Sequence, residues 1–135
     1  VARHFYDAAQ YQSILLPLNA EKTRKIFSDL ANSAAYPAYI HCTHGVDRAG
    51  SIVLILKAFL GVSKADLIRD YELSAYYHNY KHVNRNEETG GTTLKLLEGL
   101  EAYPGETLAK KTESFLASIG LSLSEVETLR SIFLE

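Results

Sequence analysis

Apolar residues along this chain recur mainly at intervals of three and four, the spacing of one face of an α-helix. We expect five or six helices. They span residues 19–32, 49–60, 63–77, 92–102 and 106–118, with a last helix from residue 122 onward. The segment 49–60 is apolar on nearly every side, so this helix should be central and buried.

Capping residues and one glycine mark the ends of several of these helices. Ser122 and Glu125 form a capping box at the start of the last helix, with each side chain accepting a backbone N–H of the other residue. Ser63 and Asp66 form a variant of this box at the start of the third helix. Gly61 readily adopts the left-handed conformation that ends a helix, so we expect it to terminate the second one.

Two short apolar runs, Tyr11 to Leu18 and Tyr36 to Ile40, predict β-strands. The polar stretch 78–91 ends in two glycines and predicts one long loop. Two strands do not form an independent sheet. The α/β interpretation therefore needs further strands, either from residues 1–10 or, as we favour, from sequence that precedes Val1.

Size and composition fit one ordinary domain. The chain has 135 residues, 47% hydrophobic and 22% charged, enough for one apolar core, so we treat residues 1–135 as a single domain. The formal net charge is -2 and no long basic run occurs, so nucleic acid is not an expected partner. No apolar stretch reaches ~18 residues, so no transmembrane segment is expected. One cysteine excludes an internal disulfide.

The start of the chain bears on its location. Val1 is the first residue, and neither a Met nor the basic region of a signal peptide is visible. This favours a cytoplasmic protein, and secretion stays open if a signal peptide precedes Val1. The start also indicates a processed product or the C-terminal portion of a longer chain. The sequence does not indicate an oligomeric state.

The most informative segment is His41–Gly50, HCTHGVDRAG, which holds the only cysteine. A strand-like run leads into it and an apolar helix follows. A strand, a tight loop and a helix N-terminus make a cradle for an anion, because backbone N–H groups and the helix dipole favour negative charge there. A thiol in such a cradle should be a thiolate near neutral pH. We therefore expect Cys42 to be a nucleophile that attacks phosphorus.

The residue types of this loop fit phosphoryl transfer, which needs a strong nucleophile and donors for the non-bridging oxygens. The N–H groups of residues 43–48 would curl around the phosphate, and Gly45 lets the backbone approach closely. Arg48 offers a planar fork that matches two phosphate oxygens. The alternative is a buried cysteine packed as a small hydrophobe, with Arg48 in a surface ion pair. That alternative leaves the glycines and the strand–loop–helix context unexplained.

The loop resembles the signature of the cysteine-dependent protein tyrosine phosphatase superfamily, His-Cys-x5-Arg followed by Ser or Thr. Its -Gly-x-Asp-Arg- form resembles the bacterial branch of tyrosine and dual-specificity phosphatases. The run Asp70 to Ser74 and the closing stretch GETLAKKTESFLASIGLSLSEVETLRSIFLE resemble later helices of that branch, so the likeness covers roughly residues 12–135. It implies an α/β fold with a central sheet flanked by helices. This chain would hold mostly the C-terminal helical part, with sheet strands missing upstream.

The resemblance also implies roles for individual residues. Cys42 would attack, Arg48 would bind the phosphoryl oxygens, and Asp47 would protonate the leaving group. Glu21 is a weaker candidate acid, and a structural carboxylate is the equal alternative for Asp47. The remaining loop positions would bind substrate (Thr43, His44, Gly45, Val46, Ala49 and Gly50), and His41 would order the loop through hydrogen bonds.

No metal or other cofactor is expected, although three potential ligands lie close together in the loop. His41, Cys42 and His44 could in principle coordinate zinc. Adjacent ligands at a strand end point in opposite directions, however, and the sequence holds no second cluster.

Two positions depart from the family pattern. Ala49 stands where the superfamily carries a hydroxyl that eases departure of the thiolate, which predicts a slow second step or a retired enzyme. Val46 stands where lipid-acting relatives often carry Lys. The expected function is hydrolysis of phosphomonoesters through a phosphocysteine intermediate, on phosphotyrosine or mixed phosphoprotein substrates. The alternatives are a pseudophosphatase that binds phosphate with little turnover, and a phosphatase for phosphoinositides or inositol phosphates.

Overall fold

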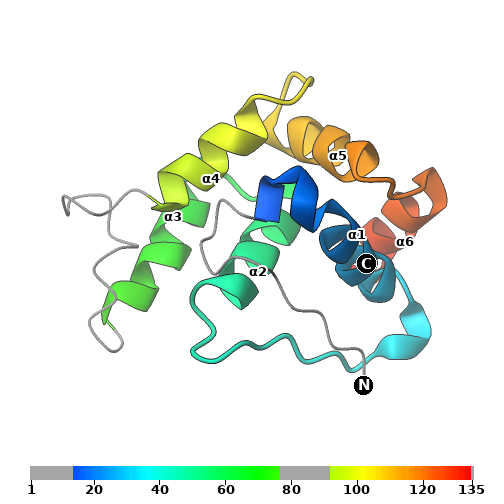
Figure 1. The fold of residues 1–135 in the computed structure, drawn as a ribbon, viewed down its shortest axis with the longest axis horizontal. Helices are drawn as coiled ribbons and strands as arrows, with labels where there is room; N and C mark the ends of the chain where they lie inside the picture. Colours follow the sequence, from blue (N-terminus) through cyan, green and yellow to red (C-terminus); the bar gives the residue numbers. More distant parts are fainter. Residues whose placement is uncertain (1–13, 77–91, 135) are drawn as a thin grey trace.

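The structure, a computed structural model, describes residues 14–76 and 92–134, and this part of the chain is helical (Figure 1). Its α-helices are α1 (Ala20–Leu30), α2 (Arg48–Phe59), α3 (Lys64–Glu72), α4 (Thr92–Glu101), α5 (Leu108–Ser118) and α6 (Leu123–Leu134). Short 3-10 turns occur as η2 (Pro17–Asn19), η3 (Ser33–Ala35) and η4 (Leu73–Tyr76). The predicted helices are all present within a few residues, and the third continues as η4. The loop predicted over 78–91 lies outside the described residues.

Helix α2 forms the centre of the core. Its apolar residues cover nearly every side, and the buried ones include Ile52, Ile55 and Phe59. Helices α3 and α5 pack against α2, and α4 packs against both α3 and α5. In Figure 1, α4 and α5 run along the upper edge of the molecule, with α2 beneath them. The prediction of a central, buried helix is confirmed.

Three phenylalanines join helices that are distant in sequence. Phe27 of α1, Phe59 of α2 and Phe115 of α5 are each at most 1% exposed and belong to the same apolar cluster. Burial of one such side chain is worth roughly 1.5–3 kcal/mol. The described helices therefore share one core. None of them is both long and apolar enough to cross a membrane.

Glycine ends α2 in the manner expected from sequence. Gly61 has a φ of 92°, a left-handed conformation, and the N–H of the next residue, Val62, donates to the carbonyl of Lys57 at 3.1 Å. This bond satisfies a carbonyl in the last turn that has no partner within the helix. Gly120 follows α5 with the same φ. The chain therefore turns sharply after both helices.

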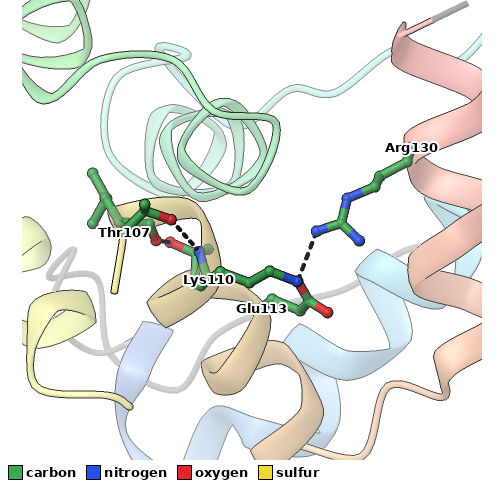
Figure 2. Close-up of polar contacts among 6 residues, drawn as sticks. Thr107, Lys110, Glu113 and Arg130 are labelled. Atoms are coloured by element: carbon green, nitrogen blue, oxygen red, sulfur yellow. Dashed lines mark hydrogen bonds and ion pairs between the residues drawn. The ribbon is translucent and has the colours of Figure 1, made fainter. Parts of the chain in front are cut away.

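Polar contacts tie α5 to α6 (Figure 2). Arg130 of α6 donates to Glu113 of α5 at 2.7 Å, and this bond is the main reason that the pKa of Glu113 lies below its usual value. Lys110 reaches the same carboxylate oxygen at 3.0 Å. The Arg130 guanidinium also lies 4.8 Å from the ring centre of Phe59. Arg130 therefore fixes α6 to both α5 and α2.

Neither predicted β-strand forms in the residues that the structure describes. Residues 14–19 form 3-10 turns, and residues 36–42 have no regular secondary structure. A strand is stable only beside another strand, and neither described range contains one for 36–42 to pair with. Pro17 and Pro37 also lack the N–H that a ladder needs. The expected central sheet is therefore not observed in residues 14–76 or 92–134.

Candidate active site

The loop between segment 36–41 and helix α2 places the Cys42 thiol near the helix N-terminus, where the Ala49 N–H contributes to lowering its pKa. Gly45 turns the loop, with a left-handed φ of 77° that other residues rarely adopt. Its backbone N–H donates to the Cys42 sulfur at 3.2 Å. Helix α2 then begins at Arg48, so the positive end of its dipole lies beside the loop. This arrangement favours negative charge on the sulfur.

The pKa of Cys42 is lowered from its ordinary value. Partial burial alone would raise it, but the backbone N–H groups of Ala49, His44 and Gly45 lower it, and so does the charge of Arg48. Together these contributions outweigh the burial. The thiolate, which is the nucleophilic form, is therefore more populated near neutral pH than it would be for a cysteine in water.

Arg48 folds back over the loop. One of its terminal nitrogens, Nη2, donates to the hydroxyl of Thr43 at 3.2 Å. This contact brings a planar cationic group with several donors to the loop that holds the thiol. A phosphate placed there would meet both the N–H groups of the loop and the guanidinium.

Several predicted substrate-binding residues turn their side chains away from the loop opening. Val46 and Ala49 are only 4% and 6% exposed, so only their backbone atoms are available to a ligand. Gly50 lies in the first turn of α2, and His44 is exposed. His41 is exposed and stacks on the ring of Tyr39, with ring centres 5.3 Å apart. The predicted role of His41 in ordering the loop is not reflected in a hydrogen bond with any described residue.

The structure places the two candidate acids in different environments. Asp47 directly precedes α2 and is partly buried, and its carboxylate makes no capping hydrogen bond to the helix. Its backbone carbonyl accepts bonds from both the N–H and the hydroxyl of Ser51, at 2.9 and 2.7 Å. Glu21 is exposed in the first turn of α1. The identity of the general acid stays a prediction. Of the two candidates, Asp47 is the one that adjoins Arg48 in the chain.

Sequence reasoning missed one residue that contacts the loop. Tyr71 of α3 donates its hydroxyl to the carbonyl of Val46 at 2.9 Å. Its place in the run Asp70 to Ser74 was the only hint of a relation to the family loop.

Two other features lie apart from this chemistry. No group of three or more His, Cys, Asp or Glu side chains that could hold a metal occurs among residues 14–76 and 92–134. A groove of about 520 Å³ follows the start of α5, and no loop residue lines it. Its walls are Pro104, Gly105, Glu106, Lys110, Glu113, Ser114 and Ala117. The candidate site is therefore the Cys42 loop itself.

Comparisons with known proteins identify the family of the chain. A curated relative, a tyrosine-protein phosphatase of Nostoc commune, is 35% identical over 54 residues. That match covers 40% of this chain but only 18% of the relative. No solved structure gives a significant match. The sequence profile of the tyrosine phosphatase family matches residues 2–135, nearly the whole chain, and the chain therefore belongs to that family.

Proposed function

We propose that this protein hydrolyses phosphomonoesters through a phosphocysteine intermediate, without a metal, and that its substrates are phosphotyrosine or mixed phosphoproteins. Family membership supports phosphatase activity. The observation that carries the finer proposal is the environment of Cys42: a thiol of lowered pKa, bound by the Gly45 N–H, in one loop with Arg48. These are the nucleophile and the anion donors that phosphoryl transfer needs.

In the first step the Cys42 thiolate attacks phosphorus, and the bond between phosphorus and the leaving oxygen breaks. The loop N–H groups and Arg48 stabilise the equatorial oxygens. Asp47 gives its proton to the leaving oxygen. In the second step Asp47 accepts a proton from water, whose oxygen attacks the phosphocysteine. The bond between sulfur and phosphorus breaks. Inorganic phosphate is released, and the Cys42 thiolate and the protonated Asp47 are restored.

Ala49 favours a second candidate function, a phosphate-binding module with little turnover. The methyl group of Ala49 is buried beside the loop, and its N–H stabilises the thiolate without a neighbouring hydroxyl at that position. Loss of such a hydroxyl slows departure of the sulfur and leaves binding intact. A phosphoinositide substrate would use the same mechanism, and the net charge of -2 and the buried Val46 disfavour it.

The domain assignment is part of the proposal. Residues 1–135 would be one phosphatase domain, mostly the C-terminal helical part of the fold. Segment 36–41 would then join a central sheet whose other strands come from sequence upstream of Val1. Its position directly before the loop supports this assignment.

The test is hydrolysis of para-nitrophenyl phosphate by the full-length protein in the presence of EDTA. We expect activity that survives EDTA, is inhibited by orthovanadate and falls by on the order of 10³ or more in Cys42→Ser. Activity that needs a metal, or that survives Cys42→Ser, would contradict the proposal. Vanadate binding without hydrolysis would favour the second candidate.

A further inference from the structure

Tyr71 reaches the candidate active-site loop from another helix. Its hydroxyl donates to the Val46 carbonyl at 2.9 Å, across a separation of 25 residues in the chain. The side chain is only 4% exposed. Water therefore has little access to this bond, and a Val46 carbonyl that lost it would be left without a replacement donor.

The ring of Tyr71 also packs against the first turn of α2. A Cβ atom added to Gly50 would lie 2.5 Å from ring atom Cε2, closer than real carbon atoms approach. Gly50 lies within the regular helix α2 and does not have a positive φ. The absence of a side chain at Gly50 therefore serves the approach of the ring. Tyr71 thus contacts both the loop and the helix that follows it.

The bond to Val46 sets the direction of a loop N–H group. The peptide bond between Val46 and Asp47 is trans, so its carbonyl and its N–H point in opposite directions. Because the carbonyl points to Tyr71, the Asp47 N–H points away from that buried side chain. The next carbonyl, that of Asp47, is held by Ser51 in the same way. The directions of two successive N–H groups, of Asp47 and Arg48, are thereby fixed, and successive N–H groups are the donors from which an anion-binding nest is made.

We propose that Tyr71 is a positioning residue of the phosphoryl-binding loop: it fixes the Val46–Asp47 peptide so that the Asp47 N–H faces the phosphoryl oxygens. Tyr71 acts through the loop backbone. That the bound anion is a phosphoryl group rests on the proposed function. The contact between Tyr71 and the loop is observed independently of that function.

Tyr71→Phe is the sharpest variant, because it keeps the ring against Gly50 and removes only the hydroxyl. In the full-length protein we would measure the Kd for orthovanadate, kcat and KM for para-nitrophenyl phosphate, and the pH profile of Cys42 alkylation by iodoacetamide. We expect vanadate affinity and kcat/KM to fall by about threefold to tenfold, the range for one neutral hydrogen bond. The alkylation profile should move to higher pH, because a looser loop stabilises the thiolate less.

Tyr36→Phe is the matched control. The Tyr36 hydroxyl also donates to a backbone carbonyl, that of Leu30, at 2.7 Å. This bond lies at the end of α1 and outside the loop, so its loss should lower the melting temperature and leave vanadate affinity unchanged. If Tyr71→Phe behaves like Tyr36→Phe, with lower stability but wild-type affinity and alkylation, the role of Tyr71 is structural only and the proposal is overturned.

Gly50→Ala provides a second route to the same contact. The added methyl should displace the ring and weaken vanadate binding, and the effects of Gly50→Ala and Tyr71→Phe should not add, because both act on one contact. Additive effects would contradict the proposal. A wild-type protein that neither hydrolyses the substrate nor binds vanadate would overturn the proposed function instead. In that case the alkylation profile of Tyr71→Phe alone decides the role of Tyr71.

Discussion

Helices α2 and α5 begin in opposite ways. At α5 the side chain of Thr107 accepts the Lys110 N–H at 3.2 Å, so a side chain satisfies the first turn (Figure 2). At α2 the Asp47 carboxylate makes no such bond, and the Ala49 N–H stabilises the Cys42 thiolate. At α5 the first-turn N–H is satisfied by a side-chain cap, which stabilises the helix. At α2 a first-turn N–H stabilises a negative charge, and we place the proposed chemistry there.

Two other helices follow the pattern of α5. Ser63 caps α3 by accepting the Asp66 N–H at 3.2 Å. At α6, Ser122 and Glu125 accept each other's backbone N–H, as the capping box predicted. Helix α1 also lacks a side-chain cap. The absence of a cap therefore becomes informative only together with the thiol and the arginine that stand beside it.

The largest expected effect comes from Asp47→Asn. This variant tests whether Asp47, which does not cap α2, acts as the general acid. With phenyl phosphate, whose leaving group needs a proton, we expect kcat/KM to fall by about 10²–10⁴. With para-nitrophenyl phosphate, a better leaving group, the loss should be much smaller. An equal loss with both substrates would argue against an acid, and a selective loss in Glu21→Gln would assign the acid to α1.

Ala49→Ser should sharpen the comparison by restoring a hydroxyl in the first turn of α2. We expect the steady-state rate to rise by roughly tenfold or more, the value of one hydrogen bond to a charged group, here the departing thiolate. A stopped-flow burst in the wild type that disappears in the variant would identify the second step as the slow one. Ala58→Ser, at a buried position of the same helix, is the control for burying a hydroxyl. A variant no faster than wild type would show that Ala49 does not limit turnover.

Thr107→Ala should affect stability alone. Loss of the α5 cap should cost about 1 kcal/mol of unfolding free energy, measured by urea denaturation. Vanadate affinity should not change, because this cap is unrelated to the loop. Ser63→Ala provides an independent repeat on α3. A fall in affinity with either variant would mean that the two kinds of helix start are coupled.

The smallest effect concerns the capping box of α6. Hydrogen bonds from the Ser122 and Ser28 side chains lower the pKa of Glu125 to about 2 in the folded protein, against ~4.3 for an unfolded chain. A lowered carboxyl pKa stabilises the fold above the unfolded value, and this contribution is lost as pH falls from about 4 towards 2. Because the group lies near the surface, we expect at most about 1 kcal/mol. Unfolding free energies of wild type and Glu125→Gln should converge at low pH, and a difference that persists at about pH 2 would contradict this account of the Glu125 carboxylate.

The helices were predictable because their signals are local. The apolar periodicity of α2, the glycine that follows it and the capping box of α6 depend on residues within a few positions of each other. The strand predicted over Tyr36 to Ile40 does not form among the described residues, because a strand depends on a partner and its own sequence does not supply one. Local signals likewise located Cys42, Gly45 and Arg48 in one loop.

The orientation of side chains within the site was not predictable. The sequence placed Val46 among the substrate-binding residues, and the structure buries its side chain in the core. The alternation of buried and exposed positions in an irregular loop has no fixed period, so no pattern reveals it. Tyr71 was equally hidden, because its contact depends on how α3 packs against α2.

The burial of Val46 has a consequence for cooperativity. Its side chain belongs to the same apolar cluster as those of α2. The loop can therefore open only by withdrawing an apolar group from the core, which ties its order to the folding of the whole domain. The proposed anion-binding loop would then need no separate folding event on binding, because its order follows from that of the core.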